Sequence, residues 1–193
     1  MKWSSQPARR CAGWFAAWVA LAAVAGAQEP TTINLSTNNC TVRFVLPGSW
    51  GAIKGEVKDL TGWARFGRPG DLNSLRGSLE VDVTALSTGD DGRDRRWHEV
   101  CLEGARFPKI TFTLEQVKVT ENKSVLLTGL LTVRDVTGRL VIGGQFTEEA
   151  GLCRLTGGGS LKWTDYGVRD LSTLLTKVKP DMKVFVELRL PLK

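Results

Sequence analysis

Apolar and polar residues alternate along most of the chain from Ile33 onward. A period of two residues is typical of β-strands that have one face in a core and the other in water. About eight or nine such segments follow one another, with turns such as Pro47-Gly48 between them and no strand–helix–strand repeat. The most regular segment runs from Met182 to Leu192, where every second residue is apolar. The pattern therefore predicts an all-β protein of antiparallel strands.

An open sheet of this many strands usually curls, splits or closes, and closure removes its exposed edges. We therefore expect an extended antiparallel barrel of about eight strands. A switch in the alternation near Lys58 and Asp59 predicts a β-bulge there. Such a barrel is either filled by its own side chains or holds one small ligand, and the alternation alone does not decide between the two.

Residues 90–104 break the strand pattern and predict the one helix of any length. The helical spacing i, i+3, i+4, i+7 is met by Trp97, Val100, Cys101 and Gly104. Asp90 or Asp91 can cap the N-terminus of this helix, and Gly104 can end it. A single helix among antiparallel strands has few places to lie. We therefore expect it to close one end of the barrel, with Trp97 as the plug.

Several glycines fall on the face that the alternation assigns to the barrel interior. They are Gly55, Gly129, Gly144, Gly157 and Gly159. Glycine leaves volume where a filled barrel would place Leu or Phe, so this set favours a cavity. The alternative is that each glycine marks a bend or a bulge at a corner of the barrel. The other inward residues are apolar, so the ligand of such a cavity would be apolar and long.

The N-terminal segment has the features of a secretory signal peptide. A basic start, with Lys2, Arg9 and Arg10, precedes a short apolar run and a triplet of small residues that ends at Ala27. We expect cleavage there, which leaves one domain at residues 28–193 in the periplasm or outside the cell; the alternative is a retained membrane anchor. Cleavage removes three basic residues and no acidic ones, so the net charge falls from +6 to +3. This charge is too small and too scattered for nucleic acid to be a partner.

The expected mature chain keeps three cysteines, Cys40, Cys101 and Cys153, at spacings that match no metal motif. We expect Cys101, on the apolar face of the helix, to be buried and reduced. If a disulfide forms, the expected pair is Cys40 with Cys153, because both lie on strands. A bridge requires Cα atoms within about 7 Å of each other.

Catalytic chemistry has little support in the sequence. His98 is the only histidine, and there is no GxSxG, HExxH or glycine-rich phosphate loop. The His98-Glu99 pair on a helix edge is more typical of hydrogen bonding than of an acid–base couple. The charged run from Arg93 to Arg96 forms either the polar face of the helix, with structural salt bridges, or a polar collar for a ligand head group. We therefore predict that the protein is not an enzyme and holds no metal.

Short motifs, in order along the chain, resemble those of the YceI-like proteins. They are Cys40-Thr41-Val42-Arg43-Phe44, the run from Arg93 to Phe112 with its Phe107-Pro108-Lys109-Ile110-Thr111-Phe112 strand, the run from Gly129 to Thr137, and Asp165-Tyr166-Gly167-Val168. The resemblance covers residues 33–193. It implies a secreted, lipocalin-like barrel of about eight strands that binds a polyisoprenoid or another lipid. Asp135 stands where family members usually carry glycine, and residues 46–52 lack a histidine that many members have there.

Together, the alternation and the resemblance predict a protein that binds, sequesters or transports a long apolar lipid without catalysis. An isoprenoid or another lipid would be its ligand, no cofactor is expected, and both a transient membrane contact and a homodimer are compatible with the sequence. The alternative, from another class, is a secreted interaction or stress-response scaffold with a filled barrel; an enzyme that uses His98 is the third reading. The expected ligand-binding residues are Phe44, Gly55, Leu79, Val81, Trp97, His98, Phe112, Gly129, Leu131, Phe146, Gly157, Gly159 and Asp165.

Overall fold

The structure is a computed structural model that describes residues 32–68, 70–170, 172 and 177–192. The predicted signal peptide, at residues 1–27, lies outside the described part of the chain, so its cleavage stays a prediction. Strands make up most of the described residues, and they are joined by short turns and by a few short helices. The alternation of apolar and polar residues therefore predicted the fold class correctly.

Eleven strands of the described chain form one antiparallel sheet, in the order β1-β4-β5-β7-β8-β9-β10-β11-β2-β3-β6. Burial follows the predicted alternation, most clearly on β8, where alternate residues from Val125 to Val133 are buried. The bounds of the strands are β1 (Thr32–Leu35), β2 (Cys40–Gly48), β3 (Gly51–Val57), β4 (Thr61–Phe66), β5 (Leu75–Asp82), β6 (Leu86–Ser87), β7 (Lys109–Val119), β8 (Ser124–Val133), β9 (Val136–Glu149), β10 (Leu152–Lys162) and β11 (Asp181–Pro191).

The strand count is higher than the predicted eight because two long runs are interrupted. Residues 58–60 separate β3 from β4, so the run ends where a β-bulge was predicted, and that prediction was wrong. A register shift of this kind lies between Leu114 and Gln116 of β7. β5 and β6 are separated only by the 3-10 helix η2 (Val83–Ala85). β1 is a further short strand at the edge of the sheet. The higher strand count therefore reflects interrupted strands and one short edge strand, and the predicted architecture is unchanged.

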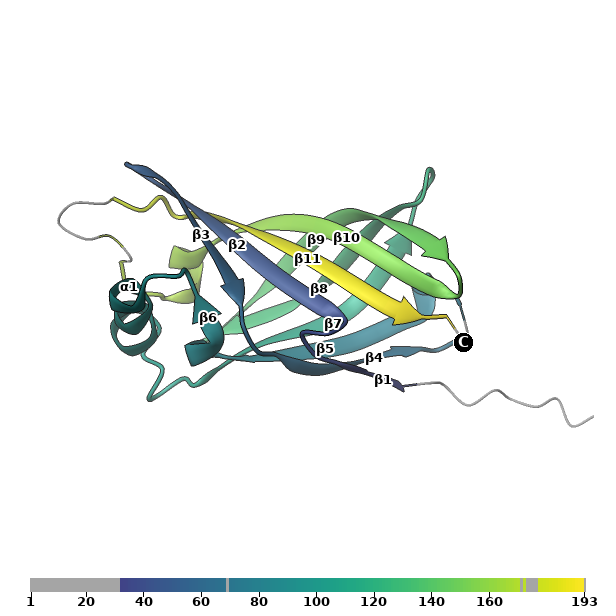
Figure 1. The fold of residues 1–193 in the computed structure, drawn as a ribbon, viewed down its shortest axis with the longest axis horizontal. Coiled ribbons are helices and arrows are strands. Elements are labelled where there is room, and N and C mark those ends of the chain that lie inside the picture. Colours follow the sequence, from purple (N-terminus) through teal and green to yellow (C-terminus); the bar gives the residue numbers. More distant parts are fainter. Residues whose placement is uncertain (1–31, 69, 171, 173–176, 193) are drawn as a thin grey trace, which may run out of the picture.

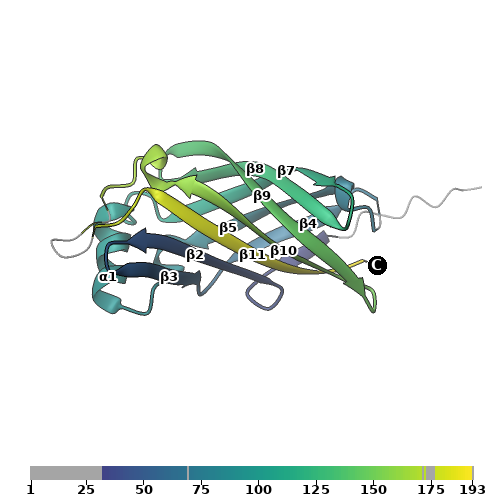
Figure 2. The same ribbon diagram turned by 90° about the horizontal axis from the view of Figure 1, so that it is seen from above.

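The sheet curls into an elongated barrel (Figure 1). β6 continues the chain from β5 but pairs with β3, which lies at the far side of the strand order. At this seam the Lys58 N–H donates a hydrogen bond to the Ala85 carbonyl at 2.8 Å. Figure 2 shows the helix α1 at one end of the barrel, while the C-terminal end of β11 lies at the other. We call these the helix end and the packed end.

The helical segment is shorter than its sequence predicts. The helix α1 (Asp91–Arg96) begins after Asp90, whose side chain accepts a hydrogen bond from the Arg93 N–H at 2.8 Å. It continues as a single π-turn, η3 (Trp97–Cys101). None of the helices in the described residues is long and apolar enough to cross a membrane.

The π-turn changes which side chains the helical segment buries. Trp97 and Cys101 are buried, as predicted, but Val100 is exposed. A π-turn adds one residue to the turn, so the simple helical spacing no longer applies after Trp97. The segment ends at Cys101 with Leu102 as its C-cap, and the left-handed residue that follows is Glu103, with φ at 52°, not Gly104. The predicted places of Val100 and Gly104 were therefore wrong.

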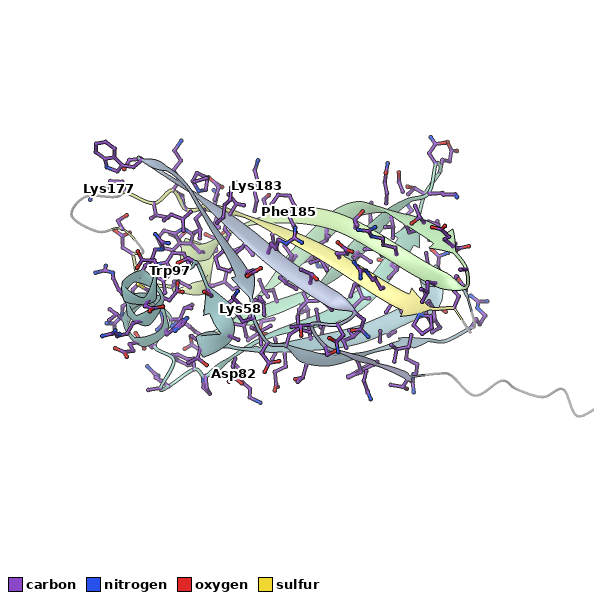
Figure 3. The ribbon with its side chains drawn as sticks, in the orientation of Figure 1. Lys58, Asp82, Trp97, Lys177, Lys183 and Phe185 are labelled. Carbon is purple, nitrogen blue, oxygen red and sulfur yellow. The ribbon has the colours of Figure 1, made fainter. Side chains whose placement is uncertain are left out.

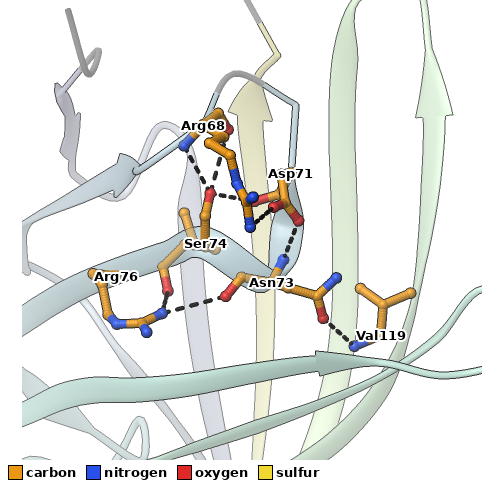
Figure 4. A network of polar contacts seen from close by, with 7 residues as sticks. Arg68, Asp71, Asn73, Ser74, Arg76 and Val119 are labelled. Carbon is orange, nitrogen blue, oxygen red and sulfur yellow. Dashed lines mark hydrogen bonds and ion pairs between the residues drawn. The ribbon is translucent and has the colours of Figure 1, made fainter.

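Side chains fill the packed end of the barrel. Deeply buried examples, with exposed fractions of 3% or less, are Cys40, Val117, Val125, Cys153, Leu155 and Leu190. The connection from β4 to β5, with the 3-10 helix η1 (Leu72–Ser74), is fixed by a polar network at this end (Figure 4). In it the Asp71 side chain accepts from the Asn73 N–H, and the Asn73 side chain accepts from the Val119 N–H, each at 3.0 Å. This network ties η1 to the end of β7.

The cysteines of the described chain are free thiols, and Cys101 is buried as predicted. Cys40 lies opposite Leu188 and Cys153 lies opposite Leu190, so β11 runs between the two cysteines. Two interstrand steps of about 4.8 Å, with the offset along β11, place their Cα atoms beyond the limit of about 7 Å. The register therefore contradicts the expected pairing. Burial raises the pKa of Cys40 to about 12 and, together with a nearby carboxylate, that of Cys153 to about 11.

Candidate functional site: an apolar lumen

The interior of the barrel is hollow between the helix end and the packed end. The cavity has a volume of about 200 Å³, far more than the roughly 15 Å³ that one water molecule needs. Its side chains are apolar apart from Ser78 and the polar atoms of one tyrosine and two tryptophans. Every strand contributes to the wall, for example Leu35 (β1), Phe44 (β2), Val57 (β3), Ala64 (β4), Leu79 (β5), Leu86 (β6), Phe112 (β7), Leu131 (β8), Ile142 (β9), Leu161 (β10) and Val184 (β11).

Strand β11 shows how the alternation builds this wall. Its inner face places Met182, Val184, Val186 and Leu188 in the wall. Six residue steps of about 3.3 Å span roughly 20 Å along the strand, which a strand tilt of about 40° shortens to roughly 15 Å along the barrel axis. The lumen is therefore long relative to its volume, a shape that fits an extended chain.

Aromatic side chains close the lumen at the helix end. Trp97 comes from the π-turn (Figure 3), and its ring centroid lies 6.1 Å from that of Phe44, with the planes tilted by 38°. The 3-10 helix η4 (Trp163–Tyr166) adds its first and last side chains to the same wall. The Trp163 Nε1–H donates to the Lys179 carbonyl at 2.8 Å. Its polar edge is thus satisfied while its ring faces the lumen.

Nearly half of the predicted ligand-binding residues line this lumen. They come from β2, β5, the π-turn, β7 and β8, so residues far apart in sequence meet in one wall. They are Phe44, Leu79, Val81, Trp97, Phe112 and Leu131. Their contact with a ligand stays a prediction.

Other predicted site residues lie away from the lumen. The Nε2 of His98 is 2.8 Å from the Leu86 carbonyl, so this histidine fixes the π-turn to β6. Asp165 is exposed to solvent in η4. Phe146 lies opposite Leu155 in the β9–β10 pairing, toward the packed end. None of the three is in the cavity wall.

The predicted glycines do not widen the lumen. A Cβ atom at Gly55 would collide with the ring of Phe44, which lies across the strand from it. A Cβ atom at Gly129 would come within 2.5 Å of the Phe112 ring. These aromatic rings already fill the space that each missing side chain leaves. The prediction that the glycines open volume was therefore wrong at both positions.

The glycines of β9 and β10 allow close approach of the two backbones. A Cβ atom at Gly157 would lie 2.9 Å from the Gly143 carbonyl oxygen, and one at Gly159 would lie 2.5 Å from the Val141 carbonyl oxygen. A Cβ atom at Gly144 would collide with the carbonyl of Thr156. Neither cavity volume nor a bulge explains these glycines, because the β9–β10 register is continuous; the structure shows that they let neighbouring backbones approach closely. A Leu at these positions would strain the sheet and would not test the lumen.

The sequence reasoning missed some lumen residues that carried a usable signal. Met182 and Val184 belong to the strand with the most regular alternation, yet they were absent from the predicted site. In the Asp165-Tyr166-Gly167-Val168 motif the acidic residue was chosen, whereas Tyr166 and Val168 are the residues that line the cavity. The inward positions of the strand alternation therefore predict the cavity-lining residues better than the chemical character of the motif residues does.

A buried carboxylate fixes α1 to the barrel. Asp94 is 8% exposed and accepts hydrogen bonds from the Thr88 N–H and from the Ser87 hydroxyl, each at 3.0 Å. The Thr88 hydroxyl also donates to it. Burial alone would raise the pKa of Asp94, but these hydrogen bonds outweigh burial and lower the pKa. Asp94 is therefore charged at neutral pH and holds the start of the helix against the end of β6.

Two of the arginines of α1 bind neighbouring segments, and all three lie outside the lumen wall. The Arg93 Nε–H donates to the Thr88 hydroxyl at 2.7 Å, and Arg96 donates to the Ser172 carbonyl at 2.9 Å. These contacts favour the structural role over the polar collar. Within the described residues, no three His, Cys, Asp or Glu side chains gather in a way that could hold a metal ion.

A second polar cluster ties together the segments that close the helix end. Glu103 forms ion pairs with Arg134 of the β8–β9 turn, at 3.1 Å, and with Arg169 after η4, at 2.6 Å. Arg134 also donates to the Gly167 carbonyl and lies 5.2 Å from the centre of the Phe107 ring. Three of the motifs recognised in the sequence therefore meet around one carboxylate.

The Asp135 departure from the family pattern does not disturb this cluster. In the β8–β9 turn it is Arg134 that has the left-handed conformation, with φ at 57°, and Asp135 does not share it. Glycine is therefore not required at position 135. The Arg134 Nε is the one buried side-chain polar atom without a partner in the described part of the chain.

Comparison with known families gives one match, and it spans nearly all of the described chain. The YceI-like domain matches residues 29–190. No curated protein matches the chain in sequence.

Solved structures share the fold at low sequence identity. BcnA from Burkholderia cenocepacia superposes with a TM-score of 0.69 at 14% identity, over 78% of this chain and 96% of that one. The YCEI protein of Campylobacter jejuni gives 0.64 at 18% identity, over 73% and 85%. A polyisoprenoid binding domain from Saccharophagus degradans gives 0.62 at 16% identity, over 84% and 99%. At these identities the likeness shows the fold alone, a curled antiparallel sheet of the lipocalin-like YceI kind.

Proposed function

The chain belongs to the YceI-like family, and we propose that it binds a long apolar lipid inside its lumen and sequesters or carries it without a catalytic step. The proposal takes the lipid to be polyisoprenoid-like. The related domain from Saccharophagus degradans, which is named for polyisoprenoid binding, supports this class of ligand. No cofactor has a part in this function.

The observation that carries the proposal is the apolar cavity. A volume of about 200 Å³ left empty would cost on the order of 5 kcal/mol, at about 24 cal/mol per Å³ of cavity. A stable small domain has only about 5–15 kcal/mol of net stability, so such a void is expensive. An apolar chain in the lumen restores the lost contacts and removes its own surface from water, at roughly 25 cal/mol per Å².

The shape and the polarity of the wall restrict the ligand. The wall carries no charged side chain, so a charged head group would remain unpaired inside it. A single extended chain fits a lumen of roughly 15 Å along the barrel axis. We therefore propose that the tail lies in the lumen and that any head group stays outside it.

The proposed location follows from the N-terminal segment. A basic start, a short apolar run and a small-residue triplet support export and cleavage after Ala27. The protein would then act in the periplasm or outside the cell, where an apolar lipid needs a carrier to cross water. The scaffold alternative, with a filled barrel, is disfavoured because the barrel is hollow.

The test is extraction of the protein without detergent. Protein purified from its own host is extracted with organic solvent, and the extract is analysed by mass spectrometry. We expect a long-chain lipid in near-stoichiometric amount. An empty extract, together with no uptake of a fluorescent long-chain fatty acid by the delipidated protein, would overturn the proposal.

A matched pair of variants on β8 tests the place of binding. Leu131 faces the lumen, whereas Leu126 is exposed on the outer face of the same strand. Leu131→Gln places an amide in the lumen and should reduce the extracted lipid about tenfold, since burying an unpaired amide costs about 1–3 kcal/mol. Leu126→Gln should leave the lipid content unchanged.

A further inference from the structure

The β2–β3 hairpin ends in a tryptophan that is largely open to solvent. Trp50 is 83% exposed, compared with 40% for Trp63, the other tryptophan among the exposed large apolar residues. It sits in the turn between Gly48 and Gly51, which pair with each other at the ends of β2 and β3. An indole placed this way leaves most of its apolar surface in water. Its preferred surroundings are the interface of a bilayer, where an aromatic ring meets lipid head groups.

Lysines surround this hairpin on the outer surface. Lys54 and Lys183 lie in one cross-strand row, because Val45 pairs with both of them. Lys177 and Lys179 are brought alongside by backbone hydrogen bonds to Ser49 and Pro47, at 2.9 and 2.8 Å. Figure 3 shows Lys177 at the end of the molecule that carries Trp97, with Lys183 farther along the barrel beside Phe185. We call Trp50 and these four lysines the basic hairpin tip.

The charge of the basic hairpin tip is only partly balanced by neighbours: Lys177 interacts electrostatically with the Asp170 carboxylate, and Asp90 lies in the wall of the adjacent groove. All four lysines are exposed, and in the described part of the chain none of them forms an ion pair. Lysines on the side of the barrel differ, since Lys58 and Lys109 pair with glutamates. Asp181, the acidic residue of β11 nearest in sequence to Lys179 and Lys183, lies opposite Lys162 on β10. The surface is therefore complementary to anions.

The basic hairpin tip lies beside the aromatic side chains that close the lumen at the helix end. A groove of about 690 Å³ runs between the hairpin and α1, and its wall includes Trp50, Lys54, Arg93 and Trp97. Trp97 also lines the lumen on its other side. A lipid chain that passes Trp97 would leave the lumen into this groove. A surface in contact with the tip would therefore face this groove.

We propose that the basic hairpin tip docks on a bilayer that contains anionic phospholipid and holds the helix end of the barrel against it. Trp50 enters the head-group layer, and the lysines lie along its surface with their charges on the phosphates. This inference rests on the proposed function, because it gives the lipid carrier a place to load or unload. A second copy of the chain is the other occupant that an exposed tryptophan could meet.

The experiment uses delipidated protein and vesicle sedimentation at low ionic strength. Vesicles that contain phosphatidylglycerol are compared with vesicles of phosphatidylcholine alone. We expect binding to the former, and added salt should weaken it. The double variant Lys54→Gln/Lys183→Gln should lower the partition coefficient about 25-fold, at about fivefold for each lysine. Trp50→Ala should lower it about tenfold.

Control variants sit far from the hairpin. Lys118→Gln/Lys123→Gln removes two exposed lysines at the packed end, and Trp63→Ala removes the other exposed tryptophan. Both should bind vesicles as the unchanged protein does. Equal binding to both kinds of vesicle, no binding to either, or equal effects of tip and control variants would overturn the proposal. So would a dimer, seen by light scattering, that Trp50→Ala converts to a monomer.

The two proposals can fail separately. Lipid in the organic extract without vesicle binding would leave the carrier function standing and remove the docking surface. Vesicle binding that depends on the tip, without lipid in the extract or uptake by the delipidated protein, would leave the docking surface standing and remove the carrier function.

Discussion

The helix end and the packed end of the barrel bury apolar side chains in different ways. At the packed end, Leu155 and Leu190 have no exposed surface. In the lumen, Leu161 and Val184 point inward from the same two strands but keep part of their surface open to the cavity. One alternation of apolar and polar residues builds both regions. Alternation therefore defines the inside of a barrel, but it does not say whether that inside is full.

The two ends also differ in how they are closed. Short turns that lead from one strand to the next close the packed end, and the network around η1 braces one of them (Figure 4). Separate segments, α1 with its π-turn and η4, close the helix end. Two carboxylates, Asp94 and Glu103, hold these segments in place. We therefore expect the helix end to open locally while the sheet stays folded.

The largest expected effect is on stability in the packed end. Leu155→Ala should lower the free energy of unfolding by about 3 kcal/mol, because it leaves a cavity in a filled region. Leu79→Ala, in the lumen wall of the delipidated protein, should cost about 1 kcal/mol, because that side chain already faces empty space. Urea unfolding measures both. Equal losses would mean that the two regions are packed alike.

The ion pairs of Glu103 should contribute more to the free energy of unfolding than an exposed ion pair does. Glu103→Gln weakens the contacts with Arg134 and Arg169 and should cost about 2 kcal/mol, because the Arg134 charge remains largely buried. Glu115→Gln removes an exposed pair with Arg139 and serves as the control. Its expected cost is below about 0.5 kcal/mol. Similar costs for the two variants would show that Glu103 does not hold the helix end together.

Acid should loosen the helix end through Asp94. The pKa of Asp94 is lowered in the folded protein, so its carboxylate adds stability above its unfolded pKa of about 3.9. This contribution is lost as the pH falls through the folded pKa. Asp94→Asn should cost about 1–2 kcal/mol at pH 7 and much less near pH 2. A pH series of unfolding free energies for both proteins makes the comparison, and a cost that stays constant with pH would contradict it.

The smallest expected effect is a difference in the labelling rates of the thiols at the two ends of the barrel. Burial raises the pKa of Cys101, as it does for the other two cysteines. Cys101 lies in the helix end, so local opening exposes it, whereas Cys40 and Cys153 require the sheet to unfold. In single-cysteine variants, a thiol reagent should label Cys101 roughly tenfold faster under native conditions. Identical rates would indicate that the barrel opens as one unit.

The sequence predicted the strands of the barrel better than the segments that close its helix end. Strand parity correctly placed Phe44, Leu79 and Leu131 on the inside, because a period of two is a local property. The glycines were misjudged because the ring of Phe44 over Gly55, and the backbone contacts of Gly159, depend on partners that only the folded sheet brings close.

The helix end was harder to predict, since its contacts join distant segments. The π-turn displaced Val100 without a signal in the spacing, and no local pattern indicates that Glu103 meets Arg134 and Arg169. The motifs did mark these segments, but not that they form one cluster. Contacts between separate segments are the part that a single sequence leaves open.

The most direct test of the lumen compares one substitution on its two sides. Val184 faces the lumen from β11, while Val141 is exposed on the outer face of β9. Val184→Phe fills part of the cavity and should reduce the lipid in the organic extract severalfold, with cooperative unfolding retained and a stability change within about 1 kcal/mol. Val141→Phe should keep the full lipid content. Equal lipid content in the two variants would contradict the account, because the lipid would then lie outside the lumen.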